Sequence, residues 1–102
     1  MLRIDDVVTG FDDNKRGRPC MVVRVVGPPR AGAWVVPRST KGRTGTFVRA
    51  GALPRLDRDG RFMFLPHFVA AADLGECESL GVLNVGDRER VLANVNDVVI
   101  DL

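Results

Sequence analysis

The chain has 102 residues, of which 45% are hydrophobic and 27% are charged. Such a mixture is typical of a folded domain rather than of a disordered segment, and the length suits one hydrophobic core. No apolar run approaches the roughly 20 residues that cross a bilayer. The first six residues turn acidic at once, without the apolar stretch of a signal peptide. We therefore expect a single cytoplasmic domain over residues 1–102.

The formal net charge of +2 conceals a basic middle. Residues 14–61 contain twelve Lys or Arg and only two acids, Asp57 and Asp59, whereas the two ends together carry three bases and eleven acids. A basic stretch of this kind is the charge pattern of a protein that binds a phosphate backbone. An ordinary solvated arginine-rich surface would give the same composition, so charge alone leaves both interpretations open.

The first two thirds of the chain indicate short strands separated by turns. Residues 19–26 form a continuous β-branched run, which predicts a strand buried on both faces, and Gly27-Pro28-Pro29 ends it. Residues 44–49 alternate as a half-exposed strand does, and Arg58-Asp59-Gly60 is a turn signal. The complete set of predicted strands is 6–11, 19–26, 33–37, 44–49, 62–65 and 80–83.

The last segment changes to helical periodicity. Its apolar positions form one stripe of an α-helix over residues 88–100: Val91, Leu92, Val95, Val98, Val99 and, just beyond, Leu102. Asn84 or Gly86-Asp87 can cap the start of this helix. The sequence thus predicts a mainly β fold, a small barrel of about five to seven strands closing on itself, followed by a C-terminal α-helix.

The cysteines and the histidine give no metal-binding pattern. Cys20 lies in an apolar run, where cysteine usually behaves as a small buried hydrophobe, and Cys77 lies far from it in the sequence. His67 is the only histidine, and the spacing typical of zinc ligands does not occur. We predict no metal site and no cofactor.

Two motifs resemble those of one protein family. Gly17-Arg18-Pro19-Cys20-Met21-Val22-Val23 is similar to the Gly-x-Arg-Pro-x run that opens the second strand of MazF/PemK toxins. Val35-Val36-Pro37-Arg38-Ser39-Thr40 is similar to their Val-Pro-x-Thr-(Thr/Ser) at the end of the next strand. The order and spacing of the motifs, with the later turn and closing helix, extend the resemblance over nearly the whole chain. It implies an SH3-like barrel of the CcdB/MazF type.

The resemblance also implies a function. Members of this family are toxins of type II toxin–antitoxin systems, and they cleave single-stranded mRNA without a metal. Arg18 matches their catalytic arginine, Ser39 matches their catalytic threonine with Thr40 beside it, and Asp13 falls where many members have a glutamate. The RNA-binding residues expected around this site are Asp13, Lys15, Arg16, Arg38, Lys41 and Arg43, and Arg49 extends the basic stretch.

These residue types suit cleavage of RNA by its own 2′-hydroxyl. The reaction builds negative charge on the scissile phosphate, and an arginine fork can donate two hydrogen bonds to its oxygens. A hydroxyl from Ser39 or Thr40 adds a neutral donor. Viewed without the resemblance, an arginine before a strand is commonly a solvated edge residue, and Ser-Thr after a proline is commonly a turn.

His67 is the candidate general base, because histidine is the usual residue type for that role and this chain has no other. Its surroundings depart from the family pattern: many relatives carry an Asp-Gln pair there, whereas this chain reads Phe64-Leu65-Pro66-His67. The first strand also lacks the family's tryptophan-rich pattern. The alternatives are therefore that His67 substitutes for the carboxylate, that the chain is a non-catalytic RNA-binding SH3-like module, or that it is a CcdB-like toxin directed at gyrase.

The expected partners are single-stranded RNA, a second copy of the chain in a homodimer, and an antitoxin protein. An acidic antitoxin segment would cover the same basic residues that hold RNA: Arg18, Arg38, Lys41 and Arg43. Trp34, Phe47 and Phe62 would either anchor such a contact or belong to the core, and the core is the commoner place for such residues.

Overall fold

The structure is a computed structural model that describes residues 6–8, 19–53, 56–75 and 79–96. Along these residues the elements are β1 (Asp6–Val8), β2 (Cys20–Val26), β3 (Gly32–Ser39), β4 (Thr46–Val48), β5 (Gly60–Phe62), β6 (His67–Ala70), α1 (Ala71–Leu74), β7 (Ser79–Val82) and α2 (Val85–Asn94). The strand content and the position of α2 confirm the prediction of a mainly β fold with a C-terminal helix.

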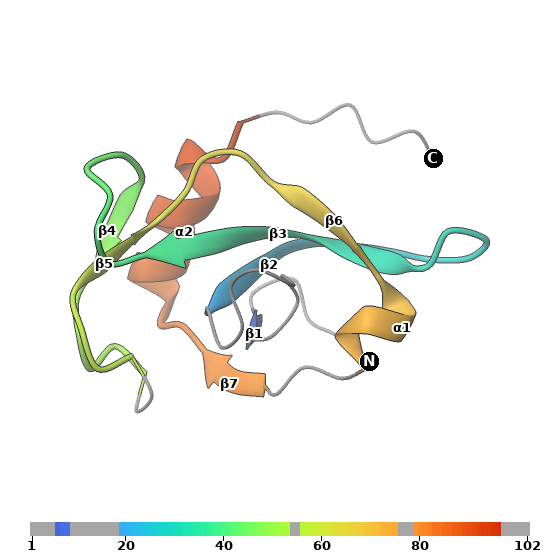
Figure 1. Ribbon diagram of the computed structural model, residues 1–102, viewed down its shortest axis with the longest axis horizontal. Helices are drawn as coiled ribbons and strands as arrows, with labels where there is room; N and C mark the ends of the chain where they lie inside the picture. The colour runs from blue at the N-terminus through green and yellow to red at the C-terminus, as the bar shows by residue number, and fades with distance from the viewer. Residues whose placement is uncertain (1–5, 9–18, 54–55, 76–78, 97–102) are drawn as a thin grey trace.

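The described strands form one curled antiparallel sheet in the order β4-β5-β3-β2-β1-β7, with β6 paired to β3 (Figure 1). Figure 1 shows the long β2–β3 pair running through the middle of the molecule, with α2 at one end. The strands β4 and β7 stand at the two ends of the order, and within the described residues they do not pair with each other. The sheet is therefore a half-barrel, and the predicted closure is not observed.

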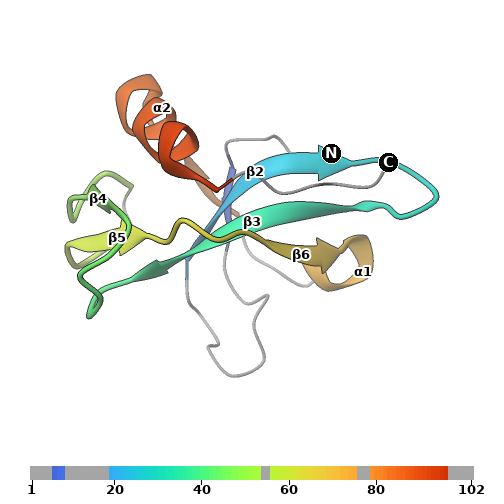
Figure 2. The same ribbon diagram turned by 90° about the horizontal axis from the view of Figure 1, so that it is seen from above.

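Strand β2 is buried at its start and more exposed toward its end. Cys20, Met21 and Val22 are fully buried, but Arg24 and Val25 are exposed. The prediction that this strand is buried on both faces is therefore wrong for its second half. The described pairs between β1 and β2 end at Met21, so Arg24, Val25 and Val26 pair with β3 alone as the strand runs toward the turn at residues 27–31 (Figure 2). The predicted proline turn ends β2 as expected.

Pro37 explains an irregularity in the strand that runs beside β3. The segment from Gly60 to Ala70 pairs with β3 at both ends, but four residues separate Phe62 from His67 where only two separate their β3 partners, Arg38 and Val35. The carbonyl of Pro37 accepts from the amide of Met63 at 2.8 Å, yet proline has no N–H to return. The ladder therefore breaks at residues 63–66 as a bulge, and the predicted strand at 62–65 is divided into β5 and β6.

The two faces of β3 support two separate hydrophobic clusters. Val36 belongs to the larger one, which includes α2 through Val91, and Val35 belongs to the smaller one. Successive strand residues point to opposite faces, so this division follows from the period of two. The larger cluster is Met21, Val36, Val48, Leu53, Leu56, Phe62, Leu80, Leu83 and Val91; the smaller is Cys20, Val22, Ala33, Val35, Val69 and Leu74.

Helix α2 begins where the sequence predicts and ends earlier. The side chain of Asn84 accepts from the amide of Asp87 at 2.9 Å, so Asn84 is the N-cap. Val95 is extended rather than helical, and the amide of Asn96 donates to the carbonyl of Phe64 at 2.8 Å. The predicted helix is thus wrong at Val95 and Asn96, and the rest of its predicted range, up to residue 100, lies outside the described residues.

We expect Asn84→Ala to destabilise the protein by about 1 kcal/mol, the usual cost of losing an N-cap. The substitution removes the bond to the Asp87 amide and the second bond from Nδ2 of Asn84 to Oδ2 of Asp87 at 2.8 Å. Urea denaturation followed by circular dichroism measures the change. Asn84→Ser restores a cap acceptor and should recover most of the loss, so equal losses in both variants would contradict the capping role.

Candidate nucleic-acid interface

Three polar or aromatic residues form a row across β3, β5 and β4. Arg61 pairs directly with Ser39 on β3 and with Phe47 on β4. Residues that lie directly opposite in an antiparallel sheet share a face, with Cβ atoms about 5 Å apart. Ser39, Arg61 and Phe47 are therefore immediate neighbours, and none of the three is buried. We call this set the outer row.

The neighbours of the outer-row residues along the three strands form an inner row on the opposite face of the sheet. Phe62 pairs with Arg38 and with Thr46, and all three side chains are buried. Asn94 of α2 donates to the hydroxyl of Thr46 at 3.0 Å. The inner row therefore faces α2, and the outer row faces away from it.

Arg38 is a buried cation in this inner row, although the sequence predicts it as an RNA contact. Arg38 is only 3% exposed. Its guanidinium carbon lies 5.6 Å from the centroid of the Phe62 ring, and its Nη2 donates to the carbonyl of Arg58. Burial lowers the pKa of the guanidinium, and the nearby carboxylates of Asp59 and Asp57 oppose that shift. The structure thus removes Arg38 from the surface that a phosphate can reach.

Arg61 is held in place from two sides. Its Nη1 donates to the carbonyl of Gly45 at 3.0 Å, and its guanidinium lies 5.8 Å from the centroid of the Phe47 ring. Gly45 has a φ of 115°, and a Cβ there would lie 2.5 Å from the carbonyl oxygen of Phe62. Only glycine fits this position, so the turn that supplies the carbonyl to Arg61 depends on the glycine at 45.

The hydroxyl of Ser39 already accepts two hydrogen bonds from its own turn. Its Oγ receives the amides of Lys41 at 3.3 Å and of Gly42 at 3.1 Å. A serine hydroxyl has two acceptor positions and one proton to donate. The turn therefore leaves Ser39 as a donor, which suits contact with a phosphate oxygen.

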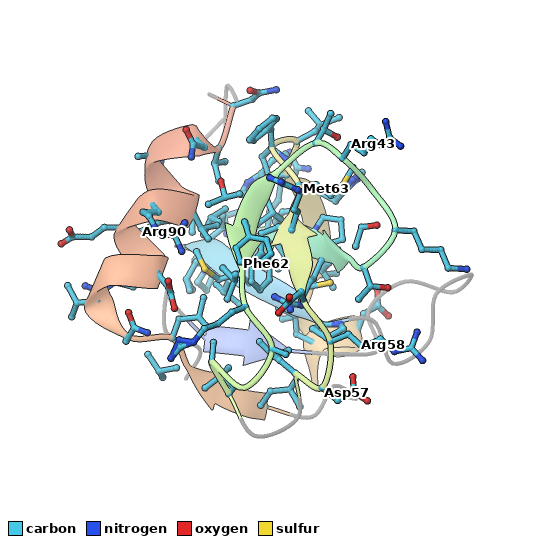
Figure 3. The ribbon with its side chains drawn as sticks, turned by 90° about the vertical axis from the view of Figure 1, so that its left-hand side faces the viewer. Arg43, Asp57, Arg58, Phe62, Met63 and Arg90 are labelled. Carbon is cyan, nitrogen blue, oxygen red and sulfur yellow. The ribbon has the colours of Figure 1, made fainter. Side chains whose placement is uncertain are left out.

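Exposed cations follow the outer row into the loop between β3 and β4. Thr40, Lys41 and Arg43 are all exposed on this loop. Figure 3 shows Arg43 and Arg58 pointing away from α2, on the other side of Phe62. Arg49 belongs elsewhere: the pKa of Asp87 at the start of α2 is lowered mainly by the hydrogen bond from Arg90, and the charge of Arg49 adds to that shift.

The residues predicted upstream of β2 lie outside the described ones: Asp13, Lys15, Arg16 and Arg18. Pro19 follows Arg18 in the chain, and its carbonyl accepts from the amide of Arg38 at 2.8 Å. The chain therefore enters β2 at the end of β3 that carries Ser39.

His67 is exposed at the start of β6, opposite Val35. Val35 lies four residues from Ser39 along β3, a separation of about 13 Å at the usual strand rise. Because a general base must approach within about 3 Å of the proton that it takes, the structure does not bring His67 and Ser39 to one reacting group. Both residues nevertheless lie on the same face of the sheet, because His67 is paired with Val35, four residues from Ser39.

A scan against protein-family models, a search of curated proteins and a search of solved structures each returned no match. Of the described residues, no three His, Cys, Asp or Glu side chains converge as a metal site. Neither described helix is long and apolar enough to span a membrane.

Proposed function

We propose that the chain is a toxin of the MazF/PemK type, a metal-independent endoribonuclease that holds single-stranded RNA on the outer row. The observation that carries the proposal is the pairing of Ser39, a free hydroxyl donor, with the anchored guanidinium of Arg61. Ser39 precedes the exposed cations Lys41 and Arg43, in a stretch from 14 to 56 that contains no acid. Donors and cations without competing carboxylates favour a phosphate ligand.

Cleavage on this surface uses the RNA's own nucleophile. The 2′-oxygen forms a bond to phosphorus as the bond to the 5′-oxygen breaks. A solvent water takes the proton of the 2′-hydroxyl, and the 5′-oxygen gains a proton as it leaves. The products are a 2′,3′-cyclic phosphate and a 5′-hydroxyl. Ser39 and Arg61 donate to the phosphate oxygens as charge builds there, and Arg18 is the proposed source of the proton.

A second candidate is an RNA-binding module of the same fold that does not cleave. The position of His67 favours this candidate. His67 lies opposite Val35, and about 13 Å along β3 separates Val35 from Ser39. In both cases the proposed architecture is the SH3-like barrel of the CcdB/MazF type. The proposed assembly is a cytoplasmic homodimer inhibited by an acidic antitoxin segment that competes with RNA for Lys41 and Arg43.

Arg61→Gln should weaken binding of a 2′-O-methyl RNA, which cannot be cleaved, by roughly tenfold to a hundredfold, the range for a hydrogen bond to a charged group. It should also reduce the slope of log affinity against log salt by about one. Arg24→Gln is the matched control, because Arg24 is exposed at the far end of β2 and pairs with Trp34 rather than Ser39. Fluorescence anisotropy across a salt series provides both quantities. Equal losses in the two variants would place the RNA elsewhere.

A further inference from the structure

We infer that Phe47 is a stacking platform for a single unpaired base, next to the phosphate held by Arg61. The inference rests on the proposed function and adds to it the residue that holds an unpaired base. It begins from an exposed aromatic side chain: Phe47 is 41% exposed, whereas its neighbours Thr46 and Val48 on the same three-residue strand are buried.

The exposed ring does not contribute to the described hydrophobic clusters, and it lies on an edge strand. An aromatic residue on an edge strand promotes aggregation, and natural edges usually carry charged residues instead. The ring is also oriented, because the guanidinium of Arg61 lies 5.8 Å from its centroid and is fixed by the carbonyl of Gly45. An aromatic ring held in one orientation at the surface suits a flat ligand.

The neighbouring residues supply the rest of a nucleotide site. Phe47 and Arg61 are directly paired, so an aromatic ring and a phosphate-binding cation stand about 5 Å apart at their Cβ atoms. This is the scale of the ribose that joins a base to its phosphate. Ser39, on the other side of Arg61, then offers its proton to the same phosphate or the next one.

Stacking on Phe47 requires a base with an open face. In a duplex both faces of each internal base are covered by its neighbours, so the platform excludes double-stranded RNA and accepts single strands, bulges and loops. Every base has a π-face, so the contact tolerates all four bases. The outer row therefore distinguishes single-stranded from double-stranded RNA, and any preference for a base sequence must come from other residues.

The test uses short 2′-O-methyl RNA carrying one 2-aminopurine, whose fluorescence is quenched when it stacks. We expect quenching by the wild-type protein and by Phe47→Trp, and loss of quenching with a fivefold to hundredfold weaker affinity in Phe47→Leu, as for one stacked base. An abasic nucleotide at the same position should weaken wild-type binding by a similar factor and leave Phe47→Leu unchanged.

Phe68→Leu is the matched control. Phe68 also has an arginine, Arg30, at 5.8 Å from its ring, but the ring is half-buried and lies against Trp34 at 5.5 Å. The Phe68→Leu variant should therefore retain both the affinity for the RNA and the quenching of 2-aminopurine. If Phe47→Leu binds like wild type, or if both leucine variants lose affinity equally, the platform is refuted while RNA binding stands; a wild-type protein that binds no RNA refutes the proposed function as well.

Discussion

Phe62→Ala should leave the protein largely unfolded. Phe62 is fully buried in the larger hydrophobic cluster, between Arg38 and Thr46 on the neighbouring strands. Removing a buried phenyl ring costs about 3–5 kcal/mol, whereas a domain of this length is stable by roughly 5–15 kcal/mol. The loss is larger here because the guanidinium of Arg38 lies over the ring and would remain buried without it. Urea denaturation followed by circular dichroism is the measurement.

Phe47→Ala is the control for this prediction, since it removes the same ring from the next strand. The ring of Phe47 is on the outer face and 41% exposed, so the expected loss is below about 1 kcal/mol. The contrast between the two phenylalanines tests the assignment of inner and outer rows. Similar losses in the two variants would show that the rows are misassigned.

Arg18→Ala should reduce RNA cleavage by at least about a hundredfold, the usual effect of removing one donor to a transition-state oxyanion. The prediction comes from the resemblance of residues 17–23 to the family motif and from the entry of the chain into β2 beside Ser39. The fold should remain intact, because the fully buried residues of β2 begin at Cys20. Cleavage of a labelled single-stranded RNA, with circular dichroism of the same sample, provides both results.

Arg24→Ala is the appropriate comparison, because it removes an arginine from the exposed end of the same hairpin. It should cleave at close to the wild-type rate. An Arg18→Ala variant that cuts as fast as Arg24→Ala would remove Arg18 from the proposed mechanism.

Local sequence patterns were sufficient for most of the elements. The continuous run at 19–26, the proline turn and the alternation around Phe47 each depend on residues close together in the chain, and each corresponds to an observed strand or turn. Asn84 was a recognisable cap for the same reason. The burial of Cys20 also follows from its immediate neighbours.

The early end of α2 and the bulge after Phe62 depend on partners distant in sequence. The apolar spacing continues past Asn94, but the side chain of Asn94 donates to Thr46 and the amide of Asn96 to Phe64. Val95 has weak helix propensity, so these contacts prevail there. Likewise, the lack of an N–H at Pro37 affects the neighbouring strand, where Pro66 is the one local signal of a break.

The candidate site was predicted only in part. Ser39, Thr40, Lys41 and Arg43 follow one another, so a motif could locate them, but Arg61 joins Ser39 through strand register alone. Its one sequence signal is its position directly after the Arg58-Asp59-Gly60 turn. The sequence predicts Arg38 at the RNA-binding surface, because a charged residue is normally exposed. In the structure, the alternation along β3 directs its side chain inward, toward Phe62.

The most direct test of the proposed function is incubation of the wild-type protein with a long single-stranded RNA in EDTA, followed by mapping of the new ends. We predict discrete cuts in unpaired regions, each leaving a 2′,3′-cyclic phosphate and a 5′-hydroxyl, since the nucleophile is the RNA's own 2′-oxygen. RNA that stays intact across several sequences, or that is cut only when Mg²⁺ is added, would contradict the account.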